Sequence, residues 1–177
     1  MTAPPTGVPA AYLALREDAQ RVLRGWTAPD PGQEGLRLEL LAHCAQHPDA
    51  MSKQGPPAHL TASALVLNRS LDKVLLTLHA KAGLWLQFGG HFEPGDESVL
   101  AAATREAREE SGIADLELHP ELAHLDLRYV GVTDDEGGYA VSDESLDVAW
   151  WPVDSLPEAS RDEIGPLAEA ARRVLAG

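Results

Sequence analysis

Three glutamates in an alanine-rich stretch constrain this chain more than any other feature of its sequence. The stretch runs from Glu97 to Glu110 and has high helix propensity, and Gly112 stands where a left-handed C-terminal cap is wanted. On a helix, Glu106, Glu109 and Glu110 share one face, since residues three and four apart are neighbours. Crowded carboxylates repel one another, and a hard divalent cation with oxygen ligands relieves that repulsion. The pattern therefore predicts a helix with a candidate metal site; the alternative is a solvated face on which Arg105 pairs with Glu109.

The remaining apolar patterns predict a sheet around this helix. Buried strands are expected at 59–68, 73–79, 84–88, 116–118, 125–132 and 146–151. The strand at 84–88 is expected to end at Gly89-Gly90, and a last amphipathic helix at 162–175 closes the chain. Strands, one long helix, more strands and a terminal helix predict a mixed sheet packed between helices, an α/β or α+β sandwich.

The first part of the chain has a different pattern. Apolar residues recur at helical spacing over 10–26 and again over 33–46, and Gly55-Pro56-Pro57 cannot continue a helix, so residues 51–57 are expected to form a linker. We therefore expect a helical extension and linker over residues 1–55 and a main domain over 56–177. The apolar stripes of the extension must be buried, either on the main domain or across a homodimer.

Composition and charge exclude several classes of function. The formal net charge of −14 opposes binding to polymeric nucleic acid, which requires clustered Lys and Arg. With 44% hydrophobic residues and no apolar run near the roughly 20 residues of a membrane span, a soluble, cytoplasmic protein without a membrane partner is expected. Residues 1–10 do not form a secretory signal pattern. Cys44 stands alone, so it is expected to be a small buried residue without a disulfide.

The segment from Gly89 to Ile113 resembles the signature of the Nudix (MutT-like) hydrolases. That signature runs Gly, five residues, Glu, seven residues, Arg-Glu, an aliphatic residue, any residue, Glu-Glu, any residue, Gly and an aliphatic residue. The positions that match in register are Arg105, Glu106, Glu109, Glu110, Gly112 and Ile113. The order of strands extends the similarity to about residues 59–175. The resemblance implies the Nudix fold, a mixed sheet sandwiched between helices, here with an N-terminal helical extension.

The resemblance also implies a reaction. In Nudix enzymes the helix glutamates, here Glu106, Glu109 and Glu110, hold Mg²⁺ or Mn²⁺ together with a backbone carbonyl of the Gly-Gly pair, here Gly90 or Gly89. Water then attacks phosphorus and cleaves the diphosphate (pyrophosphate) linkage of a nucleotide or nucleoside diphosphate derivative. Two alternatives remain open: a catalytically weak Nudix domain that senses a nucleotide, and an isomerase. The isomerases that share this fold use an active-site cysteine, which the position of Cys44 disfavours.

The sequence departs from the signature at two points. Ala107 replaces a larger aliphatic residue, and the interval from Gly90 to Arg105 is one residue too long. Either Asp96 or Glu97 can therefore fill the first acidic position. Because register within a helix is rigid, we expect Glu97 to fill it and to take part in catalysis, with Asp96 as the N-cap of the helix.

Aromatic residues offer candidate contacts to a substrate. Trp85 and Phe88 precede the Gly-Gly pair and could stack on a base, although core packing is the commoner use of both. Trp150 and Trp151 are neighbours on a strand and point in opposite directions, so the outward one is expected to form a dimer contact or a wall of the substrate site.

Polar residues complete the candidate substrate site. His91 could reach the leaving group. Arg128 could hold a phosphate, or pair with Asp126 or Asp147. Acidic residues at 134–136 and 143–144 flank a loop that could supply a catalytic acid, although a solvated turn is the commoner use of such a segment.

Overall fold

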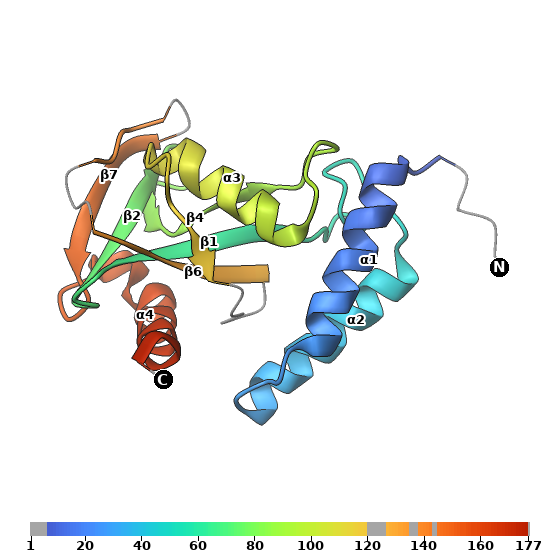
Figure 1. The fold of residues 1–177 in the computed structure, drawn as a ribbon, viewed down its shortest axis with the longest axis horizontal. Coiled ribbons are helices and arrows are strands. Elements are labelled where there is room, and N and C mark those ends of the chain that lie inside the picture. The colour runs from blue at the N-terminus through green and yellow to red at the C-terminus, as the bar shows by residue number, and fades with distance from the viewer. Residues whose placement is uncertain (1–6, 120–126, 135–137, 143–144, 177) are drawn as a thin grey trace.

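The sheet and its covering helices form three layers, with an α-helical hairpin at one end (Figure 1). The computed structural model describes residues 7–119, 127–134, 138–142 and 145–176. Within these residues the helices are α1 (Ala10–Gly25), α2 (Pro31–Gln46), α3 (Val99–Ser111) and α4 (Arg161–Ala176), and a short 3-10 helix (Glu158–Ser160) precedes α4. The strands are β1 (Thr61–Asn68), β2 (Lys73–His79), β3 (Leu84–Leu86), β4 (Phe88–His91), β5 (Leu118–His119), β6 (Leu127–Thr133) and β7 (Ser145–Pro152). The predicted fold class is confirmed.

The sheet is mixed because β1 pairs with neighbours of both directions. Its central order is β3-β2-β1-β6-β5, with β4 also paired to β1 and β7 to β2. The β1–β6 pair is parallel, and the other pairs are antiparallel. The first half of β1 pairs with β4, and its end pairs with β2. β1 therefore pairs at one end with the strand that contains the Gly-Gly pair and at the other end with β2 in the centre of the sheet.

Alternating residues of β1 face the two covering helices. Leu65 and Leu67 pack with apolar residues of α4, whereas Ala64 and Val66 pack with Ala107 of α3. This is the period of two expected for a strand, but with both faces buried. Both covering helices are thus held by one strand, and Figure 1 shows them on opposite sides of the sheet.

Two neighbouring tryptophans illustrate the consequence of that layering. Trp151 packs in the α4 layer, edge-on to Trp85 at 5.3 Å between ring centroids, and Trp150 packs in the α3 layer. The expectation that one of them faces outward is wrong, because helices cover both faces of the sheet. Both side chains are half-buried.

Gly89 and Gly90 lie in a strand, which corrects the expectation that they end one. They belong to β4 and pair with Ser63 and Ala62 of β1. A Cβ atom on Gly89 would lie 2.6 Å from the Cβ of Ser63, so only glycine permits this approach. The predicted strand over 84–88 is instead divided at Gln87 into β3 and the start of β4.

The N-terminal hairpin packs on the main domain, the first of the two arrangements considered for it. Leu15 and Leu23 of α1 and Met51 are buried in one cluster with Val99 of α3 and Tyr129 of β6. The expected linker therefore begins inside the core, since Met51 is 0% exposed. The residues on either side of this segment are also joined, because the backbone N–H of Leu60 donates a hydrogen bond to the carbonyl of Ala50 at 2.8 Å.

The start of α2 lies two residues before the expected one. Asp30 accepts a hydrogen bond from the backbone N–H of Gln33 at 2.9 Å, and Pro31 occupies the first helical position. Proline is favoured there because its missing N–H would have no partner in the helix. Pro31-Gly32, which precedes the expected helix over 33–46, therefore forms the start of α2. None of the helices described here is long and apolar enough to cross a membrane.

Cys44 is buried in α2 and forms no disulfide, as expected. Burial raises the pKa of its thiol to about 11. At pH 8 iodoacetamide should therefore alkylate Cys44 at least about a hundredfold more slowly in the native protein than in urea, because only the thiolate reacts. Mass spectrometry of timed samples measures both rates. Equal rates in the two states would contradict the burial.

Packing of α1 on the sheet predicts a difference between two leucines. Leu15→Ala should lower the free energy of unfolding by about 2–5 kcal/mol, because Leu15 is 1% exposed in the cluster shared with α3. Leu38→Ala on α2, where the side chain is 52% exposed, should change it by less than about 0.5 kcal/mol. Urea unfolding measures both.

A chain that starts at Gln54 should melt at a lower temperature than the whole chain. Equal stability would make the hairpin an independent appendage.

Candidate active site

The N-terminus of α3 is fixed by two side chains from different parts of the chain. Ser98 accepts a hydrogen bond from the N–H of Ala101 at 3.0 Å, which makes Ser98 the N-cap. Asp18 of α1 accepts one from the N–H of Val99 at 2.9 Å. Asp96 is therefore not the cap, and the expectation is corrected. The helix starts two residues later than expected, at Val99, because Ser98 adopts the extended backbone of a capping residue.

Asp96 instead binds Arg105 with both of its carboxylate oxygens. The guanidinium Nε donates to Oδ1 at 2.9 Å, and a terminal nitrogen donates to Oδ2 at 3.1 Å. The Asp96 side chain is only 4% exposed, and the pairing raises the pKa of Arg105 further above its usual range. Glu97 lies exposed on the turn before α3. The structure thus gives the paired position to Asp96 and leaves the catalytic role of Glu97 a prediction.

Arg105 also ties the loop after β4 to the helix. It donates to the backbone carbonyl of His91 at 3.1 Å. Asp96 in turn accepts a hydrogen bond from the N–H of Glu93 at 2.7 Å. Arg105 therefore holds both ends of the loop from His91 to Asp96. The residue that this chain has in addition to the signature is accommodated in the segment around the ion pair of Arg105 with Asp96.

Two of the three glutamates lie against the Gly-Gly strand. Glu110 is 7% exposed and accepts a hydrogen bond from the backbone N–H of Gly89 at 3.0 Å. Glu106 lies so close to Gly90 that a Cβ there would come within 2.5 Å of its Oε1. Glycine at position 90 is therefore what allows the carboxylate of α3 and the backbone of β4 to lie side by side.

Glu109 points to a different environment. Its side chain is 61% exposed and accepts a hydrogen bond from Arg105 at 3.1 Å, while Glu106 accepts one from the same nitrogen at 3.0 Å. The pairing of Arg105 with Glu109 is the one that the solvated-face alternative described. Arg105 thus offsets part of the charge repulsion among the glutamates.

The donor atoms at this site suit a hard cation. Glu106 and Glu110 supply carboxylate oxygens, and the backbone of Gly90, which contains a carbonyl oxygen, lies beside Glu106. Over the described part of the chain, however, no group of three or more His, Cys, Asp or Glu residues is gathered closely enough to hold a metal ion. The expected three-glutamate cluster is not assembled, because Glu109 is directed to Arg105.

A cleft of about 240 Å³ opens beside Gly90 and Glu110. Its lining residues come from β1, β2, the β3–β4 segment, α3 and α4, and are Thr61, Ala62, Ser63, Thr77, His79, Leu86, Gln87, Gly89, Gly90, His91, Glu110 and Glu163. Ser63 Oγ and Gln87 Oε1 are buried without a hydrogen-bond partner among the described residues. Unpaired buried oxygens are costly, so a polar ligand or water is needed to satisfy them.

Sequence reasoning missed most of these polar lining residues. Ser63, Thr77, Gln87 and Glu163 come from separate elements, and the fold alone brings them together. One signal was present in the sequence: along β1 the face that carries Leu65 and Leu67 carries Thr61 and Ser63 before them. Two polar residues on an otherwise apolar face of a buried strand indicate that this end of the strand faces a cleft.

The two aromatic candidates for base stacking pack in the core instead of lining the cleft. Phe88 is 0% exposed and belongs to the α3 layer, so it cannot stack on a ligand in this arrangement. Trp85 packs on Trp151 and does not line the cleft. His91 does line the cleft, and its ring lies 5.0 Å from that of His59 between centroids.

Arg128 contacts an acid that the sequence did not suggest. It lies 3.5 Å from Glu163 of α4, and the carboxylate of Asp147 instead accepts a hydrogen bond from the N–H of Val148. Asp126 lies outside the described residues. Of the acidic loop residues, Asp134 forms an exposed ion pair with Arg69, and residues 135–136 and 143–144 are also outside the described part.

Comparisons with known proteins were made over the whole chain. The family model described as the NUDIX domain matches residues 57–175. The 8-oxo-dGDP phosphatase NUDT18 of Danio rerio is 30% identical over 161 residues, which cover 84% of this chain and 45% of that relative. The chain therefore spans about half the length of this curated relative.

Solved structures agree with the fold. A hydrolase of the NUDIX family from Clostridium perfringens is 25% identical, with a TM-score of 0.50, covering 66% of this chain and 97% of its own. The Ap4A hydrolase of C. elegans, solved as a binary complex, is 22% identical with a TM-score of 0.53, covering 66% and 98%. Each of these structures covers about two thirds of this chain and nearly all of its own.

The pairing of Arg105 with Asp96 predicts effects of different size on stability for two neighbouring acids. Asp96→Asn should lower the free energy of unfolding by about 2 kcal/mol, because it removes the charge from a nearly buried ion pair. Glu97→Gln should change it by less than about 0.5 kcal/mol, because the side chain is exposed. Urea unfolding of both variants measures the difference, and a larger loss in Glu97→Gln would assign the structural role to that residue.

Proposed function

The chain belongs to the Nudix hydrolase family, and on this premise we propose that it cleaves the diphosphate linkage of a nucleoside diphosphate derivative with a divalent metal ion. The observation that carries the proposal is the position of Glu106 and Glu110 against Gly89-Gly90 at the edge of a polar cleft. Carboxylates at the edge of a polar cleft are groups that metal-assisted phosphoryl chemistry uses.

The residues of α3 would divide the work. Glu110 is oriented by the N–H of Gly89, and Glu106 is held between Gly90 and Arg105. These two and the Gly90 carbonyl would hold Mg²⁺ or Mn²⁺, with Glu109 as a further ligand or as the base that takes a proton from water. A bound metal ion would supply a water of lowered pKa and neutralise charge on the phosphates.

Arg105 is a positioning residue in this proposal. It holds the loop from His91 to Asp96 on the helix and fixes Glu106 through a hydrogen bond of 3.0 Å. It also neutralises part of the charge of Glu106 and Glu109, and so lowers the repulsion between them before a cation arrives. His91 lines the cleft next to Gly90, where it could contact the leaving phosphate.

The relatives and the cleft support the proposed substrate class. NUDT18 is an 8-oxo-dGDP phosphatase by name, and the C. elegans structure is that of an Ap4A hydrolase. Both names describe nucleotides in which phosphates are joined by anhydride bonds. Unpaired oxygens of Ser63 and Gln87 in the cleft offer acceptors for N–H or O–H groups of such a ligand.

A substrate panel tests the proposal. Purified protein with Mg²⁺ or Mn²⁺ should release mononucleotide or phosphate from at least one of 8-oxo-dGDP, ADP-ribose, a nucleotide sugar, Ap4A and the common nucleoside triphosphates. Products are identified by mass. Glu106→Gln and Glu110→Gln should each lower kcat by about a hundredfold or more, because they remove charges that hold the metal. Glu169→Gln on the exposed face of α4 is the matched control.

Two outcomes would contradict the proposal. Absence of metal-dependent release from every member of the panel, with nucleotide binding retained, would favour the alternative of a nucleotide sensor. An equal loss of kcat in Glu169→Gln and Glu110→Gln would show that the rate depends on helix charge in general and not on the site. Calorimetry at millimolar Mg²⁺ with a substrate analogue present adds an independent measure of metal binding.

A further inference from the structure

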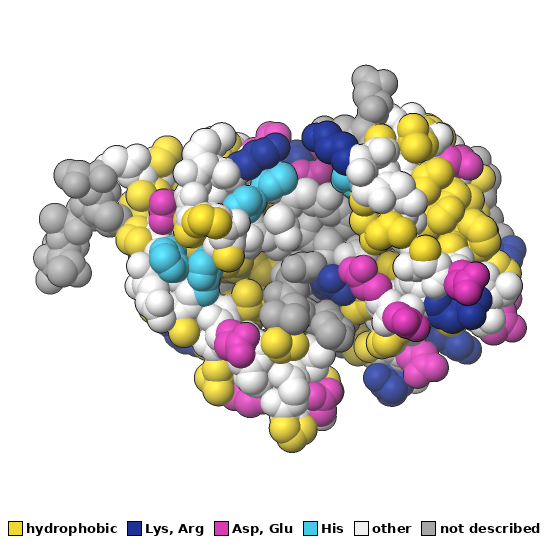
Figure 2. Space-filling view, turned by 180° about the vertical axis from the view of Figure 1, so that it is seen from behind, with side chains coloured by type: hydrophobic (Ala, Val, Ile, Leu, Met, Phe, Trp, Pro, Cys, Tyr) yellow, Lys and Arg dark blue, Asp and Glu magenta, His cyan; other side chains and the backbone are white. Residues whose placement is uncertain are grey.

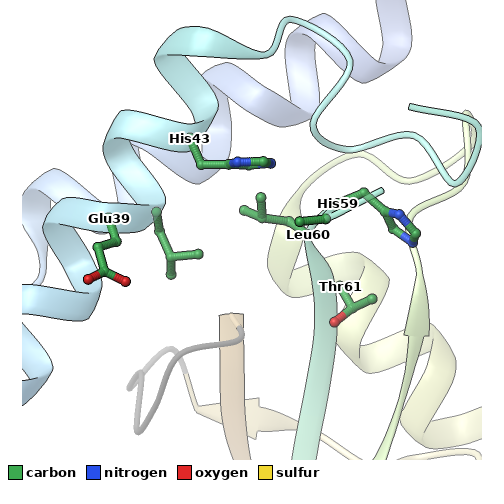
Figure 3. Close-up of a pocket in the computed structure, with 7 residues that line it drawn as sticks. Glu39, His43, His59, Leu60 and Thr61 are labelled. Atoms are coloured by element: carbon green, nitrogen blue, oxygen red, sulfur yellow. The ribbon is translucent and has the colours of Figure 1, made fainter. Parts of the chain in front are cut away.

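A second cavity lies between α2 and the start of β1, on the side of the N-terminal hairpin (Figure 3). Its volume is about 280 Å³, near the lower limit of about 300 Å³ for small-molecule sites. The α2 side contributes Glu39, Leu40 and His43, and the other side contributes His59, Leu60 and Thr61. We refer to it as the α2 cavity.

The lining of the α2 cavity combines flat, apolar and polar groups. Figure 3 shows the ring of His43 above Leu60, with Glu39 one helical turn away on α2 and His59 on the other side of Leu60. His43 Nε2 is buried and has no hydrogen-bond partner among the described residues. An unpaired buried nitrogen is stabilised by a ligand group that donates to it or accepts from it.

The α2 cavity adjoins the cleft beside Gly90. Thr61 lines both spaces, and its backbone is paired with His91, which lines the cleft. The rings of His59 and His91 lie 5.0 Å apart with an angle of 32° between their planes. A ligand can therefore extend from the glutamates along Thr61 into the α2 cavity. Figure 2 shows histidine side chains gathered on the face that lies toward the N-terminal helices.

The charge of the lining argues against a phosphate in this cavity. Its lining residues include the carboxylate of Glu39 and neither lysine nor arginine within the part of the chain described. A phosphate binds where cationic donors converge, so an anion would be repelled here. A neutral, planar ring with N–H groups matches the lining, because imidazole provides a flat face, leucine provides apolar contact and Glu39 accepts hydrogen bonds.

We propose that the α2 cavity binds the nucleobase of the substrate whose diphosphate lies at Gly90, Glu106 and Glu110. The inference rests on the proposed function and extends it, since it assigns base recognition to a helix outside the residues 57–175 that match the family model. His43 stacks on or bonds to the base, and Glu39 accepts an N–H from its edge. The N-terminal hairpin thereby takes part in substrate choice.

Binding without catalysis tests this inference separately from the reaction. Guanosine 5′-monophosphate and adenosine 5′-monophosphate serve as base-bearing probes, and ribose 5-phosphate serves as the probe without a base. In the ¹H–¹⁵N NMR spectrum of the wild type, only the base-bearing probes should shift the amides of Leu40, His43 and Leu60. His43→Ala should weaken their binding about tenfold, as loss of a stacking partner does, and leave ribose 5-phosphate unchanged.

Matched variants separate a binding role from a structural one. His47→Ala removes the imidazole whose ring lies 4.6 Å from that of His43 but which does not line the cavity, so base binding should be unchanged. His43→Leu keeps side-chain volume and should weaken base binding as His43→Ala does, with a melting temperature near that of the wild type. In turnover assays His43→Ala should raise KM for the substrate found in the panel and leave kcat within about twofold.

The possible outcomes distinguish the two proposals. Base-bearing probes that shift none of the α2 amides, or bind His43→Ala and wild type equally, would overturn the nucleobase site even when hydrolysis occurs. Base-specific shifts at α2 in a protein that hydrolyses no member of the panel would support the nucleobase site and contradict the proposed reaction. Equal effects of ribose 5-phosphate at α2 would assign the cavity to the sugar phosphate and overturn the inference.

Discussion

The ion pair of Arg105 with Asp96 is the interaction on which the geometry of the site depends. Arg105 is anchored in α3, and its guanidinium reaches Asp96, the carbonyl of His91 and the carboxylates of Glu106 and Glu109. The loop between β4 and α3 is held to the helix by these charged hydrogen bonds and by Phe92, which is 2% exposed and packs in the cluster shared with α1 and α3. The side chain of Asp96 is nearly buried in this ion pair. Moving the loop away from α3 would break the pair and separate two charges that stabilise each other.

Close packing of β4 on β1 and α3 adds a steric requirement to this electrostatic one. Gly89 permits contact with Ser63 of β1, and Gly90 permits contact with Glu106 of α3. A side chain at position 89 would clash with β1, and one at position 90 would clash with the carboxylate of Glu106. The glutamates, the strand and the loop are therefore arranged by two kinds of force: charge pairing at Arg105, and close contact at the two glycines.

The N-terminal hairpin is part of this arrangement through α1. Asp18 accepts a hydrogen bond from the first turn of α3, while Leu15, Leu23 and Met51 fill the space between the hairpin, α3 and β6. The helix that carries the glutamates is thus positioned at its N-terminus by residues that precede the sheet in sequence. The hairpin also forms one wall of the α2 cavity, so the same packing that stabilises α3 creates a second space beside the cleft.

The sequence by itself determined the elements and the shared face of the glutamates, whereas tertiary structure decided their partners. Helical spacing and strand alternation are local properties, so α3, β1 and β2 were predictable from residues close in sequence. Local reasoning failed where distant groups compete for one residue: it made Asp96 a helix cap, although Ser98 caps α3 and Asp96 binds Arg105 nine positions away. It did not suggest the contact of Arg128 with Glu163, and it could not find the cleft lined by Ser63, Gln87 and Glu163. Ion pairs and cavities depend on which surfaces meet, and that is fixed only when helices cover both faces of the sheet.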